Sequence, residues 1–274
     1  PTIEDYRDNP NYLGVIAGRC ANRIRGGDAL IGGQRFQLDR NERGKTHLHG
    51  GASGFSRRAW TVSDQRDDCV QLSLLSPSGD MGYPGTVTAR CRYEVLDGLG
   101  FRIALEAETD AETLVNLAAH GYFNLLPGSS VLEHRLEIAA ESYTPVDEDL
   151  IPDGRILPVA GTAFDFRQAR VIGAGRDGSP QGYDHNFVLA RAPWSEARHS
   201  ARLIAPDDSL AMEIRTTEPG LQFYDGQMLS APEGDGRGEM VRFGGLCLEP
   251  QRFPDAVHHK EFAQSLLRPG ETYR

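Results

Sequence analysis

A two-residue period of hydrophobicity is the feature that most constrains how this chain can fold. In residues 86–95, apolar side chains at the odd positions alternate with polar ones, and a similar alternation fills residues 101–108. The connecting segment, residues 96–100, contains an Asp-Gly pair. Strand, Asp-Gly turn and strand together are typical of an antiparallel hairpin with one solvated face. The segment therefore predicts β-structure.

Further strands are predicted along the rest of the chain. The alternation recurs in residues 209–216, and short apolar segments bounded by turn residues occur at 70–75, 113–117, 132–138, 186–189, 201–204, 221–224 and 245–249. A helical pattern is visible only near residues 254–264. Gly and Pro make up 47 of the 274 residues, above the average share of about 12%. Strands without intervening helices predict an all-β fold, a large antiparallel sandwich or barrel. With no repeat or linker, we expect one domain over residues 1–274.

Composition excludes several classes of protein. The 39 acidic and 29 basic residues give a net charge of −10, which argues against a nucleic-acid partner. No apolar run approaches the roughly 20 residues of a membrane span, so no membrane partner is expected. The 4 cysteines include no CxxC pair. We expect free thiols in a reducing, cytoplasmic compartment.

Two polar clusters in the first fifth of the chain could bind a ligand. Asn22 offers a donor and an acceptor, and the guanidinium fork of Arg23 suits oxygen-rich ligands, although a surface ion pair is the simpler explanation of Arg23. His47 and His49, two apart on a predicted strand, point to one face. They could ligate a metal or donate to a sugar, and Gly50 would let a ligand approach the backbone. No further metal ligand follows at short spacing, which favours the non-metal interpretation.

Three later clusters carry groups suited to proton transfer. His120 is flanked by aromatic residues, and its pKa could be tuned towards catalysis, although a hydrogen-bonded core histidine is the simpler alternative. Asp184 and His185 are adjacent, so on a strand they face opposite ways and do not form a dyad. Glu249 ends an apolar strand and shares a face with Cys247. A buried carboxylate is costly unless paired, and burial raises its pKa, so Glu249 is a candidate base, with a strand-end ion pair as the alternative.

The chain resembles the aldose 1-epimerase family through several motifs in the family's order. They are GRCANRI, HLHGG, NLAAHGYFNL, YTPVDEDLIPDGRI, GYDHNFVL, TTEPGLQFYDG and LCLEPQRFPDA. The resemblance extends from about Asp5 to Arg274 and implies an antiparallel β-supersandwich. It also implies further strands before residue 1 and after residue 274, so the chain is expected to be truncated at both ends.

The resemblance implies a role for each matching residue. Glu249 would be the general base that takes the proton of the C1 hydroxyl, and His120 the general acid that protonates the ring oxygen of a small monosaccharide. The hydroxyl-binding positions would be Asn22, Arg23, His49, Asp184 and Gln222. No cofactor and no metal are implied. Because the two reacting oxygens share one carbon, we expect the tips of His120 and Glu249 about 5–8 Å apart across a cleft.

Departures from the family pattern and other functions leave alternatives open. Pro250 stands where the family commonly has threonine, and His258 and His259 replace the more usual asparagine and proline. The alternatives are a non-catalytic carbohydrate-binding protein on the same scaffold, a glycosidase that uses Glu249 with Asp184, and a metal site built from histidines 47, 49 and 120. The preferred sugar and the oligomeric state stay open.

Overall fold

The computed structural model describes residues 6, 9–178, 182–229 and 241–274, which form strands joined by loops and short 3-10 turns. The chain divides into two compact units, each made of two segments. The first unit comprises Pro1–Val15 and His120–Gln251, and the second comprises Ile16–Ala119 and Arg252–Arg274. Strands β1 (Val15–Ala17) and β11 (Ala118–His120) lie where the chain passes from one unit to the other. The prediction of an all-β fold is confirmed.

The first unit contains a six-stranded and a four-stranded antiparallel sheet. The order in the larger sheet is β12-β21-β20-β17-β14-β15, and in the smaller one β16-β13-β18-β19. The larger sheet consists of β12 (Tyr122–Phe123), β14 (Ser142–Thr144), β15 (Leu157–Pro158), β17 (Asp184–Val188), β20 (Gly220–Tyr224) and β21 (Leu246–Gln251). The smaller sheet consists of β13 (Arg135–Ile138), β16 (Arg170–Val171), β18 (Arg198–Ile204) and β19 (Ala211–Thr216). The 3-10 turns are η5 (Val131–Glu133) and η6 (Ile172–Gly178).

One apolar cluster joins the two sheets of the first unit. It includes Leu136 and Leu203 from the smaller sheet and Phe187, Phe223 and Leu248 from the larger one. All five side chains are at most 3% exposed. Sheets that pack face to face in this way form a sandwich, with the inward-pointing residues of each strand as its core.

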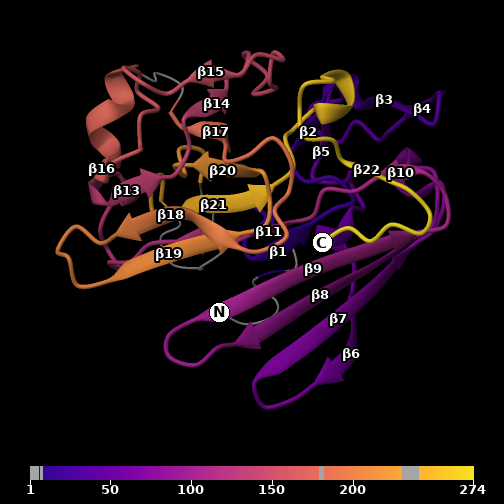
Figure 1. Ribbon diagram of the computed structural model, residues 1–274, viewed down its shortest axis with the longest axis horizontal. Helices are drawn as coiled ribbons and strands as arrows, with labels where there is room; N and C mark the ends of the chain where they lie inside the picture. The colour runs from indigo at the N-terminus through magenta and orange to yellow at the C-terminus, as the bar shows by residue number, and fades with distance from the viewer. Residues whose placement is uncertain (1–5, 7–8, 179–181, 230–240) are drawn as a thin grey trace. The chain divides into compact units, whose positions relative to one another are not determined.

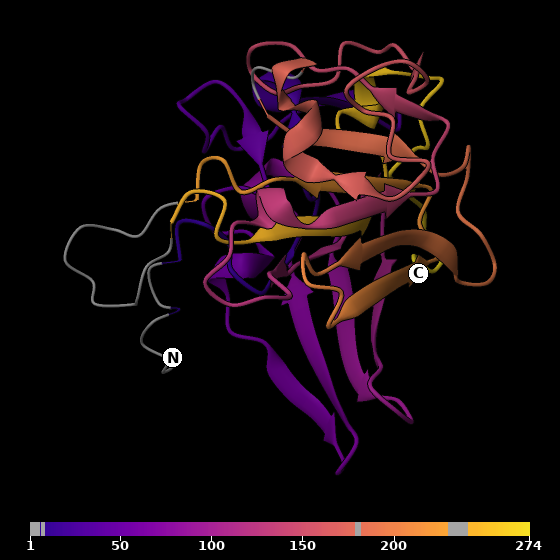
Figure 2. The ribbon, with the colours of Figure 1, turned by 90° about the vertical axis from the view of Figure 1, so that its left-hand side faces the viewer.

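The second unit is built on the four-stranded sheet β6-β7-β8-β9, whose long strands lie side by side in Figures 1 and 2. These strands are β6 (Thr61–Gln65), β7 (Cys69–Ser76), β8 (Val87–Val95) and β9 (Phe101–Thr109). Shorter strands pair as β2 (Arg23–Ile24) with β5 (His47–Leu48), β3 (Asp28–Ile31) with β4 (Gln34–Gln37), and β10 (Thr113–Leu114) with β22 (Leu266–Leu267). The 3-10 turns are η2 (Arg25–Gly27), η3 (Phe55–Arg57), η4 (Asp80–Gly82) and η7 (Ala256–His258).

Most of the predicted strands are present, and the hairpin is confirmed by its register, in which Val95 pairs with Phe101. Three predictions are wrong in part. Of the predicted strand at 113–117, only Thr113–Leu114 is a strand. The predicted strand at 132–138 begins only at Arg135, because a 3-10 turn capped by Ser130 occupies Val131–Glu133. The helical pattern at 254–264 yields one 3-10 turn, Ala256–His258, which follows Asp255 in the left-handed region. No helix in the described ranges is long and apolar enough to cross a membrane.

Candidate active site

The alternation of the strands gives the six-stranded sheet one apolar and one polar face. On β17, β20 and β21, Phe187, Phe223 and Leu248 point into the core described above. Residues of the opposite parity carry polar side chains, and register pairs them across the sheet, with Gln222 opposite Glu249. The expectation that Glu249 shares a face with Cys247 is confirmed by this register, with Leu246 and Leu248 on the core side. A buried polar face of this kind has no structural use in a sandwich core and marks a candidate site.

His120 and Glu249 lie against each other on this polar side. The Nε2 atom of His120 is 3.7 Å from Oε2 of Glu249, and the two residues are 6% and 3% exposed. β11 ends at His120, and β12, two residues later, pairs with β21 through Tyr122 and Cys247. The expected separation of 5–8 Å is therefore wrong. Side chains from neighbouring strands on one face meet directly.

The surroundings of His120 weaken its affinity for a proton. Its ring stacks with those of Tyr12 and Tyr122, at centroid distances of 6.0 and 5.3 Å, and Tyr122 donates a hydrogen bond to the Asn11 carbonyl. Burial lowers the pKa of His120 to about 4, against an opposing effect of the Asp184 charge. The Sγ atom of Cys247 lies 3.6 Å from Nδ1 of the imidazole. His120, Cys247 and Glu249 are also the one group among the described residues whose ligand atoms are arranged to hold a metal ion.

A chain of side-chain amides extends from Asp184 along the polar face. Gln222 donates from Nε2 to Oδ1 of Asp184 at 2.7 Å, and Gln251 donates to Oε1 of Gln222 at 3.0 Å. A carboxylate oxygen accepts, so the direction of the whole chain is fixed by Asp184. The other predicted carboxylate, Glu249, lies across β20 from Asp184.

Two residues of this face were missed by the sequence reasoning, Asn186 and Gln251. Gln251 also donates to Oδ1 of Asn186 at 3.3 Å. Nδ2 of Asn186 and Oε1 of Gln251 are buried with no hydrogen-bond partner in the described structure, which leaves a donor and an acceptor for another polar group. Their spacing, two residues beyond Asp184 and Glu249, is the pattern that could have found them.

Asn22 and His49 lie together in the second unit, on backbone that is unusual for residues other than glycine. Their φ angles are 60° and 48°, in the left-handed region that costs free energy and often marks functional sites. The N–H of Asn22 donates to Nδ1 of His49 at 3.3 Å, and the N–H of His49 donates to the Asn22 carbonyl. Because Nδ1 accepts, a neutral His49 carries its proton on Nε2, where it can donate to a hydroxyl.

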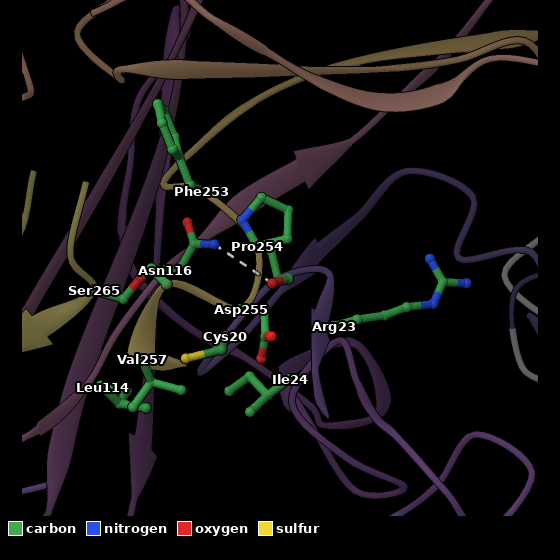
Figure 3. Close-up of a pocket in the computed structure, with 12 residues that line it drawn as sticks. Cys20, Arg23, Ile24, Leu114, Asn116, Phe253, Pro254, Asp255, Val257 and Ser265 are labelled. Carbon is green, nitrogen blue, oxygen red and sulfur yellow. Dashed lines mark hydrogen bonds between the residues drawn. The ribbon is translucent and has the colours of Figure 1, made fainter. Parts of the chain in front are cut away.

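Arg23 holds a carboxylate of its own unit. Its Nε and Nη2 atoms donate to the two oxygens of Glu42, both at 2.9 Å. The ion pair considered as the alternative for Arg23 is therefore present, and it uses two of the five N–H donors of the guanidinium group. Arg23 also borders a small pocket with Cys20, Asn116 and Asp255, and its side chain extends away from those three in Figure 3.

The structure explains His47 and Gly50 by packing within the second unit. Both ring nitrogens of His47 are engaged, at 2.6 Å from the Asp39 carbonyl and 2.6 Å from the Tyr83 hydroxyl. Since β5 ends at Leu48 and His49 has a positive φ, the expected strand alternation of the two histidines is wrong. A Cβ at Gly50 would overlap the Gly18 carbonyl. The lack of a side chain at Gly50 therefore allows its backbone to pack closely against that of Gly18.

Comparison with known proteins places this chain in a family. The family model described as aldose 1-epimerase matches residues 1–274. The galactose mutarotase of Mus musculus is 40% identical over 275 residues, 99% of this chain and 79% of that protein. The aldose 1-epimerase of Escherichia coli K12 is 37% identical over 278 residues, 98% of this chain and 80% of that protein. The chain belongs to the aldose 1-epimerase family.

Solved structures agree with this assignment. An aldose epimerase homologue from C. elegans superposes with a TM-score of 0.90 at 27% identity, covering 100% of this chain and 83% of that one. Galactose 1-epimerase from Lactobacillus acidophilus NCFM gives a TM-score of 0.81 at 30% identity, covering 99% and 80%. The fold is thus the galactose mutarotase-like β-sandwich that the resemblance implied.

Proposed function

We propose that this chain is a mutarotase that interconverts the α and β anomers of a free aldose by acid–base ring opening and closure. The observation that carries the proposal is the pair His120 and Glu249, an acid and a base 3.7 Å apart on a buried polar face, in a chain of this family. A carbohydrate-binding protein has no need of such a pair. The comparisons lend that alternative no support.

The reaction begins with one proton on the pair, carried by His120, and every proton transfer in it is reversed when the ring closes. Glu249 takes the proton of the C1 hydroxyl while protonated His120 gives its proton to the ring oxygen. The bond from C1 to the ring oxygen breaks and C1 becomes an aldehyde carbon. After rotation about the C1–C2 bond, the ring hydroxyl returns its proton to His120, the ring closes on the other face, and Glu249 protonates the carbonyl oxygen. Each role is typically worth about 10²–10⁴ in rate.

The environment of the pair suits this exchange. A lowered pKa makes the protonated imidazole a stronger acid towards the weakly basic ring oxygen. The proton moves between His120 and Glu249 by way of the sugar, so the net charge of the buried pair is the same before and after ring opening. A charge change in a buried site would be costly, and this mechanism avoids it.

The remaining predicted residues would position the sugar. Asp184 and Gln222, linked at 2.7 Å, present a fixed acceptor and donor beside the pair. Asn22, Arg23 and His49 are proposed to bind hydroxyls as well, with His49 donating from Nε2. That all these residues serve one substrate, and that the two units act as one domain over residues 1–274, remain predictions. A cytoplasmic location is also proposed, because all four cysteines are free thiols, as a reducing compartment favours.

Polarimetry tests the proposal directly. Freshly dissolved α-anomers of galactose, glucose, xylose and arabinose relax to equilibrium on their own, and the protein should accelerate at least one of them in proportion to its concentration. The matched control is the His120→Gln variant at equal concentration, which retains a side-chain amide in place of the acid. Equal relaxation with protein, with the variant and without protein, for every sugar, would refute the proposed function.

A further inference from the structure

Cys247 carries a thiol beside the acid–base pair, and the proposed mechanism does not use it. It lies on β21 two residues before Glu249, on the same face, and is fully buried. Its Sγ atom is 3.6 Å from Nδ1 of His120. A thiol beside an imidazole and a carboxylate completes a set of three side chains that all ligate zinc in proteins.

The distances within this set approach those of a coordination sphere. One ligand atom from each of His120, Cys247 and Glu249 can be chosen so that all three lie within 4.8 Å of one another. Zinc bonds of about 2.0–2.3 Å in a tetrahedral arrangement place neighbouring ligand atoms about 3.3–3.5 Å apart. The three ligand atoms therefore need to approach one another by about 1 Å to reach this arrangement.

We propose that His120, Cys247 and Glu249 form a binding site for Zn²⁺ and similar thiophilic divalent cations, and that occupation of this site inhibits the enzyme reversibly. Binding stands on the geometry alone, and inhibition rests on the proposed function. The metal displaces the thiol proton of Cys247 and the proton shared by His120 and Glu249, and both protons go to solvent. With nitrogen and oxygen lone pairs committed to the metal, neither group can exchange a proton with a sugar.

The donor set also fixes the selectivity and the pH dependence. A thiolate and an imidazole favour zinc and cadmium, whereas magnesium and calcium require oxygen ligands. Cys247 is fully buried, and the metal must displace its thiol proton in order to bind the thiolate. Affinity should therefore rise with pH, by up to about tenfold per unit for each proton released.

Cobalt spectroscopy tests the site without reference to activity. Titration of the wild-type protein with Co²⁺ should give a thiolate-to-cobalt charge-transfer band in the near ultraviolet and visible bands of tetrahedral intensity, abolished by excess Zn²⁺. The Cys247→Ser and Cys247→Ala variants should lose the thiolate band. The matched control is Cys91→Ser, which removes another buried cysteine. Absence of the band in the wild type, or its persistence in both Cys247 variants, overturns the proposal.

Polarimetry with Zn²⁺ then tests inhibition. Zn²⁺ should inhibit the wild type and the Cys91→Ser variant, EDTA should restore the rate, and Mg²⁺ should have no effect. Loss of a residue that only contacts a metal ligand weakens metal sites about 10–100-fold, and Cys247 would bind the metal directly. We therefore expect Zn²⁺ to inhibit Cys247→Ser at least about tenfold more weakly than the wild type. Equal inhibition of the wild type and Cys247→Ser by Zn²⁺ overturns the inhibitory role of this site. A cobalt band in a protein without mutarotase activity would refute the proposed function and leave the metal site standing.

Discussion

Glu249 and Leu248 are neighbours on one strand and point to opposite faces of the sheet. This explains how a carboxylate can follow directly after a residue of the apolar core. Leu248 belongs to the apolar cluster of the first unit, whereas Glu249 points to the other face, with His120 at 3.7 Å. A substitution at Glu249 that preserves shape therefore changes the chemistry without disturbing the packing. This separation makes the role of a single residue testable.

Glu249→Gln should reduce the mutarotation rate by about 10²–10⁴. The amide keeps the size of the side chain but cannot accept the proton of the C1 hydroxyl at neutral pH. Polarimetry measures the loss, and near-ultraviolet circular dichroism checks that tertiary packing is unchanged. Glu213→Gln, an exposed glutamate on β19 of the same unit, is the control and should retain full activity. A folded Glu249→Gln protein with a near-normal rate would remove this residue from its proposed role.

Tyr83→Phe should destabilise the protein by about 1–3 kcal/mol, because it leaves the buried Nε2 of His47 without its donor. The tyrosine hydroxyl is 2.6 Å from that nitrogen, and both side chains are buried. Urea denaturation followed by fluorescence measures the loss. The mutarotation rate of the folded variant should be unchanged, since His47 serves packing. A variant of wild-type stability would show that this hydrogen bond contributes nothing.

At the scale of elements, the sequence predicted strands well where one face is buried. The alternation at 86–95 and 101–108 reflects a sheet with a core side and a solvent side, and the register of β8 with β9 confirms it. The same period in β21 placed Glu249 and Cys247 together on one face. Short strands such as β12 and β15 were missed, because two residues carry no period.

The candidate site was predicted as residues but not as geometry. Motif resemblance supplied His120 and Glu249, but their 3.7 Å approach depends on β12 pairing with β21, a contact between segments more than 120 residues apart. His49 was misplaced for a local reason. A positive φ ends the strand at that residue, and no side-chain pattern predicts a left-handed histidine. Neither a register nor a backbone reversal is encoded in residue types at fixed spacing.

The turn after β21 carries a pH-dependent ion pair that the sequence marked only as a departure from the family. Asp255, fully buried and at a φ of 57°, accepts from Nδ1 of His258 at 2.7 Å and lies 3.4 Å from Nε2 of His259. The hydrogen bond to Asp255 raises the pKa of His258. The stabilisation is therefore fully present below the unfolded pKa of about 6.5 and is lost as pH rises through the higher folded value.

His258→Ala should accordingly cost more stability at pH 6 than at pH 9. Denaturant titrations of variant and wild type at both values give the two differences in unfolding free energy. The half-exposed His199 of β18 supplies the control variant, His199→Ala. An identical cost for His258→Ala at both pH values would mean that the imidazolium makes no net contribution through Asp255.

At the scale of the whole molecule, buried histidines with lowered pKa values are expected to reduce stability in acid. Burial lowers the pKa of His120 and of His185 to about 4, and also lowers those of His47 and His134. In the unfolded chain each takes up a proton near pH 6.5. Between about pH 6.5 and 4 the unfolded state therefore binds more protons than the folded state. The free energy of unfolding consequently decreases as the pH is lowered through this range.

The free energy of unfolding should decline across this window with a slope of up to about 1.4 kcal/mol per pH unit for each such histidine. His185, packed against Phe164 and Tyr143 on the core side of β17, is the position to test. In His185→Leu no proton is taken up at that site on unfolding. The slope of the unfolding free energy between pH 6.5 and 4 should therefore decrease by up to about 1.4 kcal/mol per pH unit. Denaturant titrations at half-unit intervals give both slopes, with His199→Ala again as control. Because the comparison is between slopes, any constant cost of repacking the core around the leucine cancels. Parallel curves for wild type and His185→Leu would instead assign acid unfolding to other groups.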